Sequence, residues 1–109
     1  MMKAAILIAL LVSPNLALAV DPVSVKVHSV KPGRPYAEVL YEVENSSSRA
    51  YEAIQVSCGV FDEGGGLVGA SKQYVQNIKP GEKDYSRLLV DVDSDAAPKS
   101  ARCRVVDLR

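Results

Sequence analysis

Short runs of alternating apolar and polar residues recur along this chain, and residues that favour turns separate them. The alternation predicts six strands, at residues 22–30, 36–44, 51–62, 67–75, 83–92 and 100–108. A repeat of two places the apolar side chains of a strand on one face. No stretch beyond the N-terminal segment keeps the 3.6-residue repeat of an amphipathic helix. The chain is therefore predicted to be all-β, with each strand burying one face.

Two turn signals support hairpins between these strands. Gly64, Gly65 and Gly66 follow the third run, and Pro80 with Gly81 follows the fourth. Glycine accepts the positive φ angles of tight turns. Pro80 fixes the φ angle at the first corner of its turn, and Gly81 accepts a positive φ angle at the second. Six or seven short antiparallel strands within residues 20–109 are typical of a two-sheet sandwich. A small closed barrel fits the same pattern and is the alternative.

The first residues have the form of a secretory signal peptide. Lys3 precedes an apolar run over 4–12, and Ala17 and Ala19 occupy the positions that a signal peptidase reads. Pro14 interrupts the run, whereas a membrane span needs about 20 apolar residues. We expect a signal peptide at 1–19, cleaved to leave a domain at 20–109. No cysteine lies near the cut to carry a lipid, so the product is expected in the periplasm or outside the cell without a stable membrane anchor.

The two cysteines, Cys58 and Cys103, both lie on the apolar phase of their predicted strands. An even number of cysteines in an exported domain indicates a disulfide bond. The bond requires the two Cα atoms to lie within about 7 Å. Two inward-facing positions on neighbouring or facing strands meet this condition, and we predict a Cys58–Cys103 disulfide.

Composition argues against several classes of function. Of the 109 residues, 13 are basic and 13 acidic, and no run of like charge suggests a nucleic-acid partner. His28 is the only histidine and falls on a polar phase, so it is interpreted as a surface residue and not as a metal ligand. The serines have no histidine in phase, and no phosphate-binding loop is present. We expect no enzyme activity, no cofactor and no metal.

Acidic residues in two predicted turns leave a calcium site open as an alternative to simple turn capping. Asp62 and Glu63 form one cluster, and Asp91, Asp93 and Asp95 form another. Calcium is bound by several oxygen atoms that converge from a tight turn. The second cluster lacks the glycine and the distal glutamate of an EF-hand loop, and aspartate is common in turns because it caps the local backbone.

From Asn45 onward the order of features resembles the FxLYD-type families of small immunoglobulin-like domains in bacterial exported proteins. Cys58 stands where the motif has its first aromatic residue, and Phe61 and Asp62 follow before a glycine hairpin. The Pro-Gly turn at Pro80 and Gly81 resembles the turn before a late strand in that family. The resemblance covers about residues 39–106. It implies an immunoglobulin-like sandwich with an accessory or binding role, although a fold alone does not determine a function.

These observations predict a non-enzymatic accessory or protein-interaction module whose partner is another exported protein. A secreted enzyme inhibitor, or a module that binds a small ligand or carbohydrate, is the alternative. Arg102 and Arg104 on the last strand, together with Tyr51 or Tyr85, form the predicted surface, because interfaces favour tyrosine and arginine. Alternatively, the arginines merely keep the strand soluble and pair across the sheet with an acidic residue of the second strand, Glu38, Glu42 or Glu44. The sequence indicates neither the oligomeric state nor a particular partner.

Overall fold

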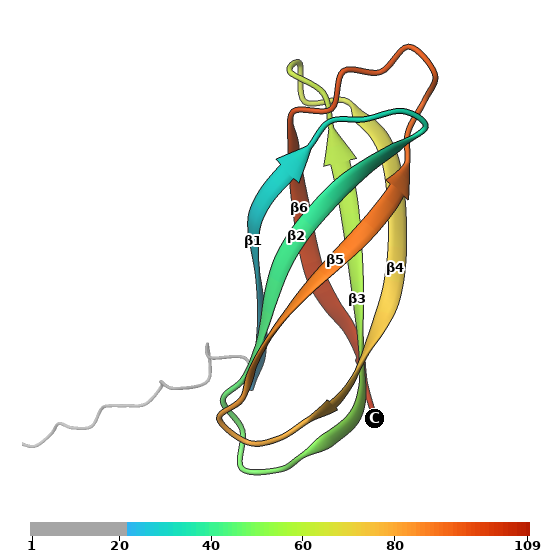
Figure 1. Ribbon diagram of the computed structural model, residues 1–109. Coiled ribbons are helices and arrows are strands. Elements are labelled where there is room, and N and C mark those ends of the chain that lie inside the picture. The colour runs from blue at the N-terminus through green and yellow to red at the C-terminus, as the bar shows by residue number, and fades with distance from the viewer. Residues whose placement is uncertain (1–21) are drawn as a thin grey trace, which may run out of the picture.

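The computed structural model of the chain describes residues 22–109, and the expected signal peptide at 1–19 lies outside them. The described residues form six strands and no helix (Figure 1). In chain order these are β1 (Val23–Lys31), β2 (Tyr36–Asn45), β3 (Tyr51–Phe61), β4 (Leu67–Ile78), β5 (Lys83–Asp91) and β6 (Ser100–Leu108). Each of the six corresponds to a strand predicted from the alternation, although β4 continues beyond its predicted end at residue 75, and the all-β fold is confirmed.

The strands form two three-stranded antiparallel sheets. The first sheet, which we call sheet A, has the order β1-β2-β5, and sheet B has the order β4-β3-β6. The sheets pack face to face, so that β1 lies against β6 and β5 lies against β4 (Figure 1). No strand pairing joins the two sheets within residues 22–109. The fold is thus the predicted two-sheet sandwich and not the alternative barrel.

The core is built mainly from the two middle strands. Strand β2 is paired on both sides, and every second residue of it points inward and is almost completely buried. Strand β3 behaves in the same way, which confirms its expected central position. The inward residues of the two strands are Ala37, Val39, Tyr41, Val43, Ile54, Val56, Cys58 and Val60. Burial of these apolar side chains is the main stabilising contribution to the sandwich.

The predicted disulfide between Cys58 and Cys103 is present and links β3 to β6. The two cysteines are direct cross-strand neighbours, and their Cα atoms are 4.0 Å apart. No side chain of β6 is fully buried, whereas Cys58 is completely buried. The bond therefore anchors an edge strand that contributes little to the core.

A buried asparagine organises one end of the sandwich. The Asn45 side chain is inaccessible to solvent, and its amide donates hydrogen bonds to the carbonyl oxygens of Arg49 (2.8 Å) and Ile78 (3.3 Å). Its side-chain oxygen accepts hydrogen bonds from the backbone and hydroxyl of Ser47. A buried polar group is costly unless its hydrogen bonds are made. Asn45 meets this requirement and joins the β2–β3 turn to the end of β4.

Both glycine turns form as predicted. Gly65 has a φ angle of 87° at the tip of the β3–β4 hairpin, where its amide donates to the Asp62 carbonyl at 3.0 Å. Gly81 has a φ angle of 79° after Pro80, and the Glu82 amide closes this turn on the carbonyl of Lys79 at 3.0 Å. Side chains larger than hydrogen rarely accept such φ angles, so these two positions require glycine.

Candidate interaction surface

The predicted site residues Arg102 and Arg104 lie on the outer face of sheet B, where the neighbouring side chains are small. Arg102 lies opposite Gly59 on β3, and Arg104 lies opposite Ser57. Ala70 follows on the far side of Gly59. These small residues leave a depression of about 520 Å³ that the two arginines line. The two cationic side chains thus stand beside a hollow of predominantly small residues.

An aromatic ring completes this surface. The guanidinium carbon of Arg102 lies 4.4 Å from the centre of the Phe61 ring, an arrangement in which cation and π system attract each other. Gly59 makes room for the ring and for Leu67: a Cβ atom there would lie 3.4 Å from Phe61 and 3.2 Å from the Leu67 side chain. Leu67 is 61% exposed. We call Phe61, Leu67, Arg102 and Arg104 the β6 surface.

The arginines of the β6 surface have no acidic partner in the part of the chain that the structure describes. Within residues 22–109 no ion pair involves Arg102 or Arg104. The interpretation that they pair with the glutamates of β2 is wrong, because β2 belongs to sheet A and its glutamates point away from sheet B. The carboxylate of Asp107, also on β6, pairs with Arg109 at 2.9 Å, and this hydrogen bond raises the pKa of Arg109.

Neither predicted tyrosine joins the β6 surface. Tyr51 is only 7% exposed, so its ring is not available to a surface formed by the arginines. A β-bulge explains the burial of Tyr51: the amides of Glu52 and Ala53 both donate to the carbonyl oxygen of Arg109, at 2.7 and 3.2 Å. The extra residue reverses the alternation and turns Tyr51 inward. Tyr85 is 67% exposed, but it lies on β5 of sheet A.

The sequence interpretation missed two aromatic residues that lie beside arginines on sheet B. Phe61 lies on the same phase of β3 as Ser57 and Gly59, which is the phase opposite the apolar run. Its outward position was therefore available from the alternation. Tyr74 on β4 is also missing from the prediction; it is 40% exposed, and Arg109 lies 5.1 Å from its ring centre.

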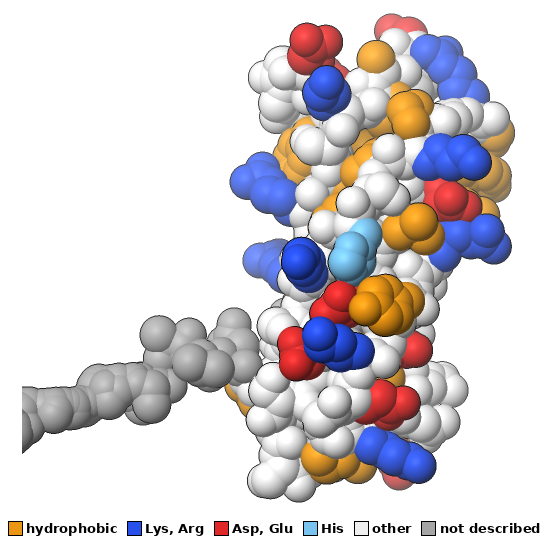
Figure 2. Space-filling view, turned by 60° about the vertical axis from the view of Figure 1, so that its left-hand side comes forward, with side chains coloured by type: hydrophobic (Ala, Val, Ile, Leu, Met, Phe, Trp, Pro, Cys, Tyr) orange, Lys and Arg blue, Asp and Glu red, His pale blue; other side chains and the backbone are white. Residues whose placement is uncertain are grey.

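The outer face of sheet A differs because its charges are paired between strands. The His28 ring lies 2.9 Å from Glu42, Lys83 lies 3.9 Å from the same carboxylate, and Arg87 pairs with Glu38 at 3.2 Å. The hydrogen bond with His28 lowers the pKa of Glu42, and the nearby lysines add to the effect. Acidic and basic side chains accordingly lie side by side around the histidine in Figure 2.

An exposed ring lies among these pairs. The centres of the Tyr85 and His28 rings are 5.6 Å apart. Together with Leu40 and Arg87 they line a hollow of about 510 Å³ on sheet A. Rings beside a hollow are common where small ligands bind.

Two acidic clusters in the predicted turns are candidate calcium ligands: Asp62 with Glu63, and Asp91 with Asp93 and Asp95. Within residues 22–109 no three or more His, Cys, Asp or Glu side chains gather as metal ligands. The carboxylate of Asp62 instead accepts a hydrogen bond from the Gly66 amide at 2.8 Å, inside its own hairpin. This is the turn-capping role that aspartate commonly takes.

In comparisons with known proteins, no family model, no curated protein and no solved structure matches the sequence. The part of the chain from Pro22 onward also contains no helix long and apolar enough to cross a membrane.

Proposed function

We propose that the protein is an exported, non-enzymatic interaction module that binds another exported protein through the β6 surface. The observation that carries this proposal is a pair of arginines that lie beside an exposed leucine and an aromatic ring and have no acidic partner in the described part of the chain. Interfaces are enriched in arginine and aromatic residues, and arginine binds carboxylates through two parallel hydrogen bonds. An acidic region of a partner would supply the carboxylates that residues 22–109 do not place beside these arginines.

Export after cleavage at Ala19 is supported by the Cys58–Cys103 disulfide. Such bonds persist in oxidising compartments such as the periplasm and the cell exterior. Mass spectrometry of the protein recovered from the periplasm or medium tests this part of the proposal. A mature N-terminus at Val20 is expected, and an intact Met1 on the recovered protein would refute cleavage.

The order of the strands supports an immunoglobulin-like assignment. In that pattern, strands A, B and E share one sheet, and strands C and F share the other with C′ on the edge beside C. The orders β1-β2-β5 and β4-β3-β6 correspond to A-B-E and C′-C-F. The resemblance to FxLYD-type domains implies the same class and an accessory or binding role.

Crosslinking followed by affinity capture from a periplasmic extract tests the binding function. The variant with Arg102→Ala and Arg104→Ala should lose the captured partner while its melting temperature stays unchanged. Lys72→Ala is a suitable control, since Lys72 is exposed on β4 in the same sheet. Equal capture by the arginine variant and the unaltered protein would refute the assignment of the β6 surface.

A module that binds a small ligand is the second candidate, and the hollow beside Tyr85 on sheet A favours it. A screen of small molecules and carbohydrates by melting temperature tests it, because a ligand that binds the folded state raises this temperature. The Tyr85→Ala variant should lose any such increase. Turnover of a generic ester, glycoside or peptide by the pure protein would refute both candidates.

A further inference from the structure

The sandwich is open along the side where β1 faces β6. A groove of about 600 Å³ lies between these strands, lined by residues 22–25 of β1 and its approach and by residues 103–108 of β6. Val25 and Val105 are only partly buried there. Leu108 lies opposite the buried Ile54, on the inner side of β6, yet it is 37% exposed. The groove therefore exposes apolar side chains that point toward the core.

The backbone of β6 is also free on this side. Within residues 22–109, β6 pairs only with β3, and β1 pairs only with β2. The Cα atoms of Cys58 and Cys103 are 4.0 Å apart, which is the short spacing of an antiparallel pair that does not exchange hydrogen bonds. The amide and carbonyl of Cys103, and those of Ala101 two residues earlier, therefore point away from β3. These groups are available to an additional strand.

The side chains of β6 indicate what such a strand would contain. A strand paired with β6 places alternate side chains into the groove, against Val25 and Val105, and the others on the outer face of sheet B. On that face they would lie beside Arg102 and Arg104, which have no acidic partner among the described residues. Opposite charges on neighbouring strands attract, whereas like charges repel.

We propose that the groove between β1 and β6 accepts an extended segment of a partner protein, which adds a strand to β6 and alternates apolar with acidic residues. Its backbone pairs with Ala101 and Cys103, its apolar side chains fill the groove, and its carboxylates meet Arg102 and Arg104. This inference rests on the proposed function and specifies the chemical character of the partner. Strand addition to a sheet edge is a common mode of peptide recognition.

Charge argues against a second copy of this chain as the occupant. If β6 paired with β6 of another copy, the unpaired arginines of both copies would share one face of the joined sheet. Strand β1 carries Lys26 and Lys31 as exposed residues and offers no acidic side chain. The two edge strands that border the groove, β1 and β6, are therefore both basic, and an acidic segment complements either of them.

Four synthetic peptides of about eight residues, a usual strand length, test the proposal on protein expressed from the full chain. The first alternates valine with glutamate, and the second alternates valine with lysine. The third has the composition of the first in a blocked order. The fourth repeats the first with N-methyl groups on alternate amides, which removes the backbone donors that pair with β6. Fluorescence anisotropy gives the affinities.

We expect the first peptide to bind at least about tenfold more tightly than the other three, a difference of about 1.4 kcal/mol. It should slow hydrogen exchange at the amides of Ala101 and Cys103. Arg102→Glu with Arg104→Glu should weaken its binding about tenfold or more, and Lys72→Glu should not. Equal affinity for all four peptides, or binding without slower exchange on β6, would overturn the proposal.

Competition separates this inference from the proposed function. If a partner captured through the arginines is displaced by the first peptide, both stand. If that partner is captured but the peptide neither binds nor displaces it, strand addition is wrong and the interaction function stands. If the peptide protects β6 but no partner is captured, the groove is a strand acceptor and the proposed function fails. A concentration-dependent dimer that excludes the first peptide would show that a second copy is the occupant and overturn the inference.

Discussion

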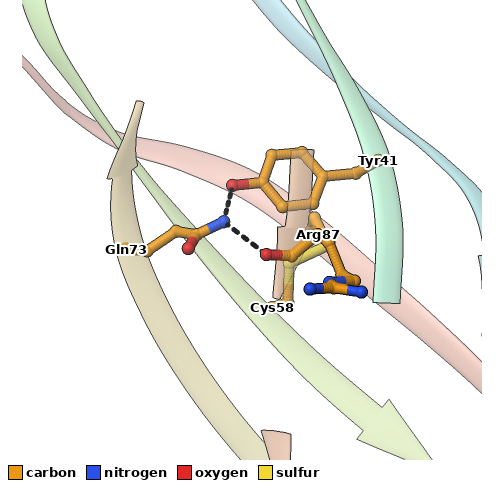
Figure 3. The surroundings of a disulfide bond; sticks show 5 residues. Tyr41, Cys58, Gln73 and Arg87 are labelled. Carbon is orange, nitrogen blue, oxygen red and sulfur yellow. Dashed lines mark hydrogen bonds between the residues drawn. A yellow bond between two sulfur atoms is a disulfide. The ribbon is translucent and has the colours of Figure 1, made fainter. Parts of the chain in front are cut away.

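The two long edges of the sandwich differ, because hydrogen bonds join the sheets along one edge and leave the other open. Where β5 faces β4, the Gln73 side chain donates to the Tyr41 hydroxyl at 2.5 Å and to the Arg87 carbonyl at 3.3 Å, so that one amide joins both sheets (Figure 3). Nearby, the Asp93 amide donates to the Val68 carbonyl at 3.1 Å. Where β1 faces β6, no hydrogen bond joins the two strands within residues 22–109. The disulfide instead ties β6 to its own sheet.

Burial follows this difference. On the closed edge, Leu88 and Val90 of β5 and Val75 of β4 are at most 6% exposed. On the open edge, Val25 of β1 and Val105 of β6 remain partly exposed although they too point inward. Alternation therefore determines which face of a strand turns inward. It does not determine whether that face is covered, because the cover depends on how closely the neighbouring sheet approaches.

The largest effect is expected from the open edge, on replacing Cys58→Ala together with Cys103→Ala. The disulfide closes a separation of 45 residues and anchors a strand without a fully buried side chain. Loss of such a bond from a small domain lowers the free energy of unfolding by about 2–5 kcal/mol. Urea unfolding followed by circular dichroism measures it. Two titratable thiols in the denatured, unreduced protein would contradict the premise.

The closed edge should respond most to Gly69→Ala. A Cβ atom at Gly69 would overlap the Asp91 carbonyl oxygen and lie 3.1 Å from the Val90 side chain, so β4 and β5 could not keep their present separation. Overpacking of this kind costs about 1–3 kcal/mol. Thermal unfolding measures the loss. Gly64→Ala is the matched control, because its Cβ atom would have only an ordinary contact at 3.6 Å with Asp62; an equal loss in both variants would argue against a close approach of the edges.

The polar bridge of the closed edge is tested by Tyr41→Phe, which removes the hydroxyl that accepts from Gln73. The loss of a buried hydrogen bond should lower stability by about 1 kcal/mol. A double-mutant cycle with Gln73→Leu isolates the pair. Gln76→Leu, at an exposed position on the same strand, is the control. If the effects of Tyr41→Phe and Gln73→Leu are additive, the bridge does not join the sheets energetically.

The same tyrosine predicts a dependence on alkaline pH. Burial raises the pKa of Tyr41 above its usual value of 10.0, despite the opposing hydrogen bonds with Gln73 and Ser86. A group whose pKa is raised on folding stabilises the fold below its unfolded pKa, and this contribution is lost as pH rises through the folded pKa. Above about pH 10, the free energy of unfolding should therefore fall more steeply with rising pH in the unaltered protein than in Tyr41→Phe. Parallel pH profiles would contradict a buried phenol.

Features indicated by residues close together in the sequence were predicted, whereas features set only by distant residues were not. Alternation and turn residues predicted all six strands, and the phases of Cys58 and Cys103 predicted their bond. The inclusion of Tyr51 in the predicted surface was wrong. The bulge that buries Tyr51 depends on the far end of the chain, where the carbonyl oxygen of Arg109 accepts from two β3 amides. Asn77, with a φ angle of 59°, lies in the same irregular region on β4, which extends beyond its predicted end.

The sequence could predict only that part of the candidate surface that lies on a single strand. Arg102 and Arg104 share a face because they are two residues apart on β6. Their neighbour Phe61 and the distant Tyr85 could be distinguished only once the sheet order was known, since that order decides which strand lies beside β6. The groove between β1 and β6 likewise depends on the distance between the sheets, which no local pattern encodes.

The smallest effect is expected from Glu42→Gln, which tests whether surface charge holds the open-edge strand β1 to its sheet. Glu42 lies on β2 between His28 of β1 and Lys83 of β5, and the His28 hydrogen bond is the main cause of its lowered pKa. A carboxylate with a lowered pKa stabilises the fold above its unfolded pKa, about 4.3 for glutamate, and this contribution is lost as pH falls through the folded pKa. The variant should melt slightly below the unaltered protein at pH 6, and the difference should disappear toward pH 3. It should also shrink in high salt, because exposed ion pairs are screened.

Glu63→Gln, at the exposed tip of the hairpin, is the control; an equal and salt-independent difference in both variants would show that β1 is held by its backbone pairing with β2 alone.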